Sequence, residues 1–75
     1  MKLRAEGREE GRAEGRAQGR AEVVVRILEL RGVAVPDAVR ERVMGCGDMS
    51  ILDVWFDRAL VAGSAEELFQ DADRR

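Results

Sequence analysis

The chain has 75 residues, 4% of them aromatic, so it makes at most one domain with a thin core and needs further support to be stable. Its single cysteine, Cys46, excludes an internal disulfide and fits a cytoplasmic setting, and the absence of histidine leaves too few nitrogen and sulfur ligands for a zinc site. The formal net charge of −2 and the lack of a long apolar run exclude a strongly basic protein and a membrane-spanning helix, so a protein partner is the expected support.

The N-terminal segment, residues 1–22, is built on a repeat of four residues. Glycine recurs at Gly7, Gly11, Gly15 and Gly19, and arginine follows each glycine. Ala, Arg, Glu and Gln are good helix formers, so we predict a helix although each interior glycine costs about 1 kcal/mol relative to alanine. At about 100° per residue, the glycines form one stripe, arginine lies on one side, Glu or Gln lies on the other, and mostly alanine lies behind.

The cost of these glycines is explained if a second helix packs against their stripe, because small residues four apart let two backbones approach closely. The flanking charges predict the orientation. A two-fold parallel pair sets arginine against glutamate, whereas an antiparallel pair sets arginine against arginine. A period of 4.0 residues, longer than the helical 3.6, favours a right-handed crossing with a close but short contact. We therefore expect a homo-oligomer, with a parallel dimer favoured, formed through this charged helical stalk.

A small helical domain is predicted for residues 23–70. Its first apolar residues continue the N-terminal helix with a wide apolar face: Val23, Val24, Ile27, Leu28 and Leu30. Gly32 is expected to cap the C-terminus of this helix. Pro36 begins a second helix with Asp37 in its first turn, and Val39 and Val43 are expected to face inward.

A third helix is predicted after the break at Gly45-Cys46-Gly47, with Asp48 as its N-cap. Its apolar residues recur at helical spacing: Leu52, Trp55, Phe56, Ala59 and Leu60. Gly63 ends this helix, and residues 64–67 have the form of a capping box that opens a short last helix with Leu68 and Phe69. Residues 71–75 are predicted to be a frayed tail. The predicted fold is thus all-α: a long N-terminal helix followed by two or three short helices in a small bundle.

Catalytic chemistry has few residues to use in this sequence. With no His, Tyr or Thr, the usual general bases and nucleophile pairs cannot be assembled. Asp53 and Asp57, four apart, could share a magnesium ion, but a solvated helix face explains them better. The Pro36-Asp37 pair lacks the continuation of a nuclease signature, and Cys46 has no neighbouring His or Lys to activate it. We predict a protein that is not an enzyme and has no catalytic residue, cofactor or metal.

The predicted interface combines the glycine stripe, its charged flanks and part of the apolar domain. Its residues are Gly7, Gly11, Gly15, Gly19, Arg8, Arg12, Arg16, Glu10, Glu14, Val24, Ile27, Leu28, Trp55 and Phe56.

An alternative is a nucleic-acid-binding accessory domain that uses a row of arginines along the phosphate backbone. That row comprises Arg4, Arg8, Arg12, Arg16 and Arg20. Acidic neighbours almost cancel its charge and no aromatic residue lies between the arginines to stack on bases, so pairing of helices is favoured over direct nucleic-acid binding. A further alternative is that the glycine-rich repeat is disordered in the isolated chain.

Several segments together suggest a family. They are the charged glycine repeat, residues 27–32, residues 35–43, Cys46, Asp48, Leu52, residues 55–60 and residues 64–69. In these segments the chain resembles the C-terminal region of the Rpn-type recombination-promoting nucleases, bacterial proteins often labelled transposases. Members of that family carry a PD-(D/E)xK nuclease domain ahead of this region, and this sequence lacks it. The resemblance therefore implies a detached tail that begins at Met1. The glycine repeat and the missing nuclease domain motivate the hypothesis that this tail binds the tail of a full-length nuclease relative and blocks its activity in mixed oligomers.

Overall fold

The structure is a computed structural model that describes the backbone of residues 2–74 and the side chains of residues 11–70. It contains the helices α1 (Lys2–Leu30), α2 (Asp37–Met44) and α3 (Met49–Ala59) and the 3-10 helix η1 (Ala65–Arg74). No strand occurs within residues 2–74. The predicted all-α fold, with one long N-terminal helix and shorter helices after it, is confirmed.

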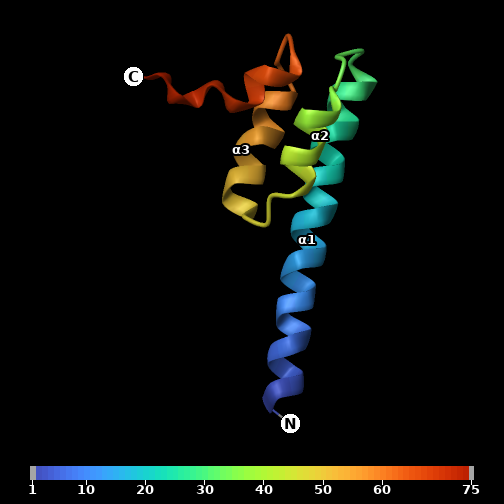
Figure 1. The fold of residues 1–75 in the computed structure, drawn as a ribbon, viewed down its shortest axis with the longest axis vertical. Coiled ribbons are helices and arrows are strands. Elements are labelled where there is room, and N and C mark those ends of the chain that lie inside the picture. Colours follow the sequence, from blue (N-terminus) through green and yellow to red (C-terminus); the bar gives the residue numbers. More distant parts are fainter. Residues whose placement is uncertain (1, 75) are drawn as a thin grey trace.

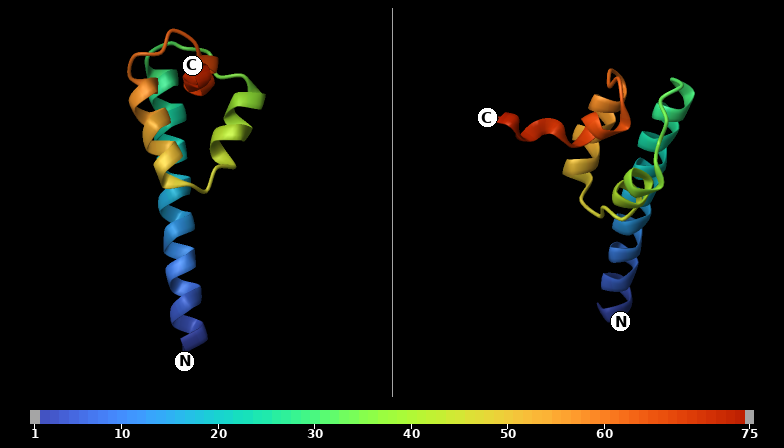
Figure 2. Two further views of the ribbon diagram at one scale, coloured as in Figure 1. Left: turned by 90° about the vertical axis from the view of Figure 1, so that its left-hand side faces the viewer. Right: turned by 45° about the horizontal axis from the view of Figure 1, so that its top comes forward.

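The long helix α1 is a rod, and α2 and α3 both pack against its C-terminal half (Figure 1). The chain runs up α1, returns along α2 and ascends again along α3, so α3 is roughly parallel to α1 (Figures 1 and 2). η1 lies across the end of α3, and the N-terminal half of α1 extends beyond the other helices (Figure 1). No helix within residues 2–74 is long and apolar enough to cross a membrane.

The core lies where α1, α2, α3 and η1 meet. Its buried side chains are Ala17, Ala21, Val24, Val25, Leu28, Val39, Val43, Leu52, Trp55, Ala59, Ala62, Ala65 and Leu68. Ala17 and Ala21 belong to the repeat, so the bundle begins earlier along α1 than the predicted boundary at residue 23. The reason is geometric: the alanines behind the glycine stripe lie on the same face of α1 as Val24 and Leu28.

Two helix ends have the caps that the sequence predicts. Gly32 has a φ of 79°, and the Val33 and Gly32 amides donate to the Leu28 and Glu29 carbonyls at 2.8 and 3.0 Å, which is a Schellman motif. At the start of α3, the Ser50 amide donates to Asp48 Oδ1 at 2.9 Å.

The start of η1 differs from the predicted capping box. Glu67 Oε1 accepts from the Gly63 amide at 2.8 Å, one residue before the expected donor at Ser64. The Glu67 amide donates to the Ser64 carbonyl at 3.2 Å, an i→i+3 bond that winds this turn more tightly than an α-helix. After a kink at Gln70 the backbone of η1 continues to Arg74, past the predicted end of the last helix.

Arginine side chains join the helices at their ends. Arg31 Nη1 donates to the Ala59 and Ala62 carbonyls at 2.9 and 2.6 Å, which connects the end of α1 to the end of α3. Arg58 Nη1 donates to the Leu68 carbonyl at 3.0 Å and so connects α3 to η1. The bond to Ala59 satisfies a carbonyl that the end of α3 leaves without a helical partner, and the three bonds together join α3 to its neighbours.

Candidate self-association surface

The glycine stripe is open in the described part of α1. A Cβ atom built on Gly11, Gly15 or Gly19 meets no atom within 4 Å, and the side chains of residues 11–16 are all exposed. Gly7, Arg8 and Glu10, which are also predicted interface residues, lie outside the described side chains, as does Arg4. The close helix contact that these glycines permit is therefore not made by this chain to itself at residues 11–19.

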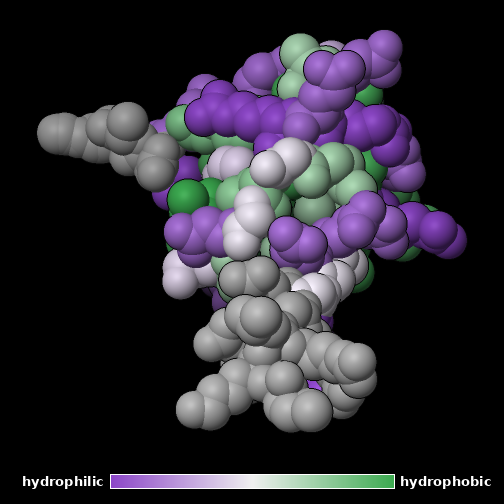
Figure 3. Space-filling view, turned by 60° about the horizontal axis from the view of Figure 1, so that its bottom comes forward, coloured by the Kyte–Doolittle hydropathy of each residue, from purple (hydrophilic) through white to green (hydrophobic). Residues whose placement is uncertain are grey.

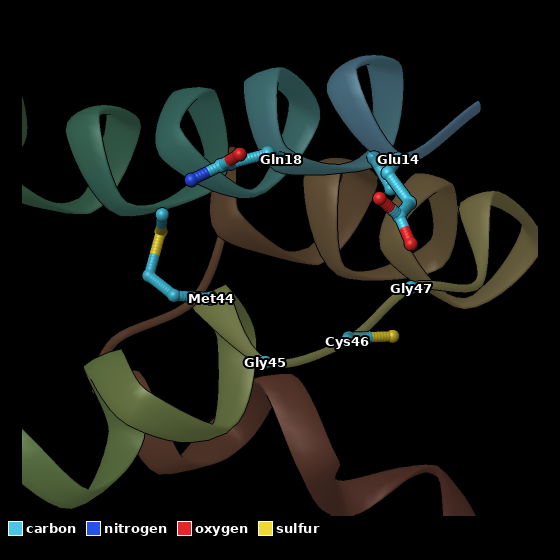
Figure 4. A pocket seen from close by; sticks show the side chains of 7 residues that line it. Glu14, Gln18, Met44, Gly45, Cys46 and Gly47 are labelled. Carbon is cyan, nitrogen blue, oxygen red and sulfur yellow. The ribbon is translucent and has the colours of Figure 1, made fainter. Parts of the chain in front are cut away.

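The two charged flanks lie on opposite sides of the stripe, as helical spacing predicts. Arg16 and Arg20 lie toward α3 and line a notch that includes Met49. Glu14 and Gln18 lie toward the turn after α2 and line an open pocket of about 350 Å³ (Figure 4). Arginine and acid are thus separated across one helix face, so a partner meets a different charge on each side of the stripe.

Arg20 is the one repeat arginine among residues 11–70 that binds its own chain. Its Nε atom lies 3.4 Å from Asp53 Oδ1, and its Cζ atom lies 4.8 Å from the centre of the Phe56 ring. Within residues 11–70, Arg12 and Arg16 form no such pair. The arginine row is therefore interrupted at its C-terminal end, where Arg20 is drawn onto α3.

The acidic side chains of the repeat on the other flank also have no ion pair among the described side chains. Glu14 and Glu22 are exposed and form no salt bridge with any residue from 11 to 70. Glu29 does, since Arg40 Nη2 lies 2.6 Å from its Oε2. Charges of both signs are therefore left for a partner around the glycine stripe, whereas the charges near the end of α1 are paired between helices.

The apolar residues predicted for the interface are used by the fold itself. Val24, Leu28 and Trp55 are buried, and Ile27 and Phe56 are partly buried against the core. Within the single chain, the α1 residues among them pack against the other helices, and Trp55 and Phe56 of α3 pack into the same core. Their burial gives these residues a role in the core of the single chain, and their part in an interface stays a prediction.

Other apolar residues remain exposed. Val23 is 42% exposed, Leu30 75%, Leu60 51% and Val61 79%, although the wide apolar faces of the sequence included the first three. Val23 follows Gly19 by four residues, so it extends the line of the glycine stripe. The four-residue spacing is the sequence signal that adds Val23 to this candidate surface.

Figure 3 views the molecule with the N-terminal end of α1 toward the reader. On this face, hydrophobic areas of the bundle are separated by hydrophilic side chains.

The residues considered for chemistry are not brought together. Asp53 pairs with Arg20, and no cluster of three His, Cys, Asp or Glu side chains that could hold a metal occurs among the described residues. Cys46 is partly buried, with Sγ 3.7 Å from the Asp48 carbonyl. Glu14 is the one charged residue that lines the pocket beside Cys46. Its carboxylate lies at the edge of the pocket, opposite Gly47 (Figure 4).

Comparison with family models, with curated proteins and with solved structures gave no match. The class of the protein is therefore defined by its own fold: a small all-α bundle whose first helix projects beyond the core.

Proposed function

We propose that this protein is a self-association module in which two copies pair in parallel through α1. The observation that supports this most directly is the open glycine stripe. Each interior glycine weakens the helix by about 1 kcal/mol. No atom of the chain's other helices packs into the space beside Gly11, Gly15 or Gly19. A second backbone against the stripe gives these glycines a role and supplies the packing that the projecting part of α1 lacks.

The charges favour a second copy as the partner. At 1.5 Å rise per residue, Arg16 in a parallel pair is level to within about 3 Å with the partner's Glu14. Two-fold symmetry makes this contact twice, and neither group has an ion-pair partner within residues 11–70. Exposed pairs of this kind each contribute up to about 1 kcal/mol and mainly set orientation.

The small core supports the same proposal. Its largest fully buried side chains are leucines and valines: Leu28, Leu52, Leu68, Val24 and Val43. A bundle of this size gains only about 3–5 kcal/mol from such a core. Pairing of copies adds stability in proportion to the logarithm of the protein concentration, as any association with the folded state does.

The test replaces Gly11 and Gly15 by leucine. Because both positions are open in the single chain, the double variant is expected to fold, to gain helicity and to lose the dimer, as measured by light scattering at several protein concentrations. Ala13→Leu is the matched control, since Ala13 is exposed on another face of the same turn. A double variant that keeps the dimeric mass, or a natural chain that is monomeric with an ordered α1, refutes the proposal.

A nucleic-acid-binding role is the second candidate, because Arg12 and Arg16 are exposed and have no ion pair within the described side chains. The engagement of Arg20 by Asp53 weakens it by shortening the arginine row. Binding through phosphates falls steeply as salt rises, whereas a glycine-packed dimer is far less sensitive. Titration of the chain with duplex DNA at two salt concentrations, beside light scattering in the same buffers, separates the two functions.

We further propose, on the resemblance to the C-terminal region of Rpn-type nucleases, that the cytoplasmic partner includes a full-length nuclease with a similar tail. Mixed pairing through α1 then lowers the nuclease activity. Adding the chain to such a nuclease is expected to reduce DNA cleavage, and the Gly11→Leu, Gly15→Leu variant is expected to have no effect. Equal inhibition by both chains contradicts this mechanism.

A further inference from the structure

We infer that the contact between two copies extends from the glycine stripe onto the start of α3, where a notch beside Gly19 receives the partner's Gln18 and Glu22. This inference rests on the proposed parallel pairing of α1. It names a second contact, made by a part of the bundle that the glycine repeat does not include.

The notch has a volume of about 340 Å³ and is lined by Arg16, Gly19, Arg20 and Val23 of α1 and by Met49 of α3. Gly19 lacks the side chain that would fill it, and a Cβ atom there meets nothing within 4 Å. Val23 is 42% exposed on its other edge. The notch is therefore continuous with the open face of α1, so that a helix on the glycine stripe also covers the notch.

The position of the notch along the axis of α1 determines which residues of the partner lie beside it. In a parallel pair the arginine side of one copy faces the acidic side of the other. The notch spans residues 16–23 of α1, and the partner's acidic side at that height presents Gln18 and Glu22. Both side chains are exposed in the single chain, and Glu22 has no ion pair within residues 11–70.

The charge of the notch matches this pair of side chains. Asp53 balances Arg20 and holds its guanidinium group at the wall of the notch, where Phe56 lies within cation–π distance. Arg16 is then the one lining charge without an ion pair within residues 11–70. In the parallel pair it lies between the partner's Glu14 and Gln18 in height, and the partner's Glu22 lies within about 3 Å of the level of Arg20. One carboxylate and one amide suit such a site better than two carboxylates, and Gln18 stands where the neighbouring repeats carry Glu14 and Glu22.

Opposite charges placed at Met49 test the inference. Met49→Glu puts a carboxylate opposite the partner's Glu22 and is expected to raise the dimer dissociation constant about threefold at low salt, whereas Met49→Lys leaves it unchanged or lowers it. The effect of the same charges on folding has the opposite sign. Met49 is the first residue of α3, where a carboxylate stabilises the helix and an ammonium group destabilises it.

Analytical ultracentrifugation of the full chain at several concentrations measures the dissociation constants, and thermal unfolding followed by circular dichroism measures folding. Val54→Glu and Val54→Lys are the matched controls, since Val54 is exposed on α3 and does not line the notch. They are expected to leave the dissociation constant unchanged. Glu22→Lys tests the other side of the contact without altering the core and is also expected to weaken the dimer.

The outcomes separate this inference from the proposed function. A natural chain that stays monomeric overturns both. A natural dimer whose dissociation constant is the same in the Met49→Glu, Met49→Lys and Glu22→Lys variants overturns the notch contact and leaves the glycine pairing in place. A dimer weakened by Met49→Glu and Glu22→Lys, and not by Met49→Lys, supports the inference.

Discussion

The two halves of α1 show what decides whether a helix is held by its own chain. Both halves have the same backbone, and the repeat continues from one into the other. In the C-terminal half, Ala17, Ala21, Val24 and Leu28 form one buried line under α2 and α3. In the N-terminal half, residues 11–16 are exposed on every side. The difference lies in what packs against the helix, because the repeat has the same good helix formers and the same glycines on both sides of residue 16.

The comparison also separates two roles for small residues. The alanines at positions 17 and 21 let the other helices approach α1 within the chain. The glycines at positions 11, 15 and 19 face open space. Substitutions in the bundle are therefore expected to change the stability of the single chain, whereas substitutions at the glycines are expected to change association.

The largest effect is expected in the bundle. Leu52 is fully buried between α3 and its neighbours, and Leu52→Ala is expected to destabilise the chain by about 2–5 kcal/mol through lost burial and the cavity that remains. In so small a domain this loss leaves little folded protein. The neighbouring Ile51 is 43% exposed and serves as the control, since Ile51→Ala is expected to cost much less. Chemical denaturation measures both, and equal effects contradict the assigned core.

The link between α1 and α3 is expected to give the next largest effect. Arg31→Ala removes two hydrogen bonds from a charged donor to the Ala59 and Ala62 carbonyls, and is expected to cost about 1–2 kcal/mol. Arg26→Ala is the control, because Arg26 is exposed in the last turns of α1 and has no such bond among residues 11–70. Denaturation curves for the two variants that coincide show that the Arg31 contacts do not stabilise the fold.

The open half of α1 is expected to respond in the opposite direction. Gly15→Ala adds a methyl group that meets nothing in the single chain, so at low protein concentration it is expected to raise helix stability by about 1 kcal/mol. The same methyl group keeps two backbones apart and is expected to weaken the dimer. Circular dichroism at low concentration measures helix stability, and ultracentrifugation at high concentration measures the dimer dissociation constant. A variant with both a more stable helix and a tighter dimer contradicts close packing at Gly15.

The smallest effect is expected for the exposed pair between Glu29 and Arg40. Although the atoms are only 2.6 Å apart, both side chains are nearly half exposed, so Arg40→Ala is expected to cost about 0.5 kcal/mol or less. High salt is expected to abolish the difference. A loss above about 1 kcal/mol in thermal unfolding shows that the pair does more than join two exposed surfaces.

Local signals predicted most of the fold. Gly32 and Asp48 each imply a cap through their own chemistry, and the turn at Gly45-Cys46-Gly47 separates two helices by itself. The extent of burial was harder to predict. The sequence shows that Val23, Val24, Leu28 and Leu30 are apolar, yet only the positions of α2 and α3 decide that Val24 and Leu28 are buried and that Val23 and Leu30 are exposed.

The candidate site was predictable where it depends on one helix and not where it depends on two. Helical geometry alone places glycine, arginine and acid on separate faces of α1. The contact of Arg20 with Asp53 and Phe56, and the notch that Met49 completes, join residues far apart in the sequence. No spacing within the repeat distinguishes Arg20 from Arg16, so only the packed structure separates their roles.

One consequence follows from small side chains on opposite faces of α1 at the same height. Between residues 15 and 21 the helix carries glycine toward the outside and alanine toward the core, so it is a thin partition there. A helix laid on the outer face comes unusually near the side chains of α2 and α3. Between such a helix and the core there is then little more than the backbone of α1.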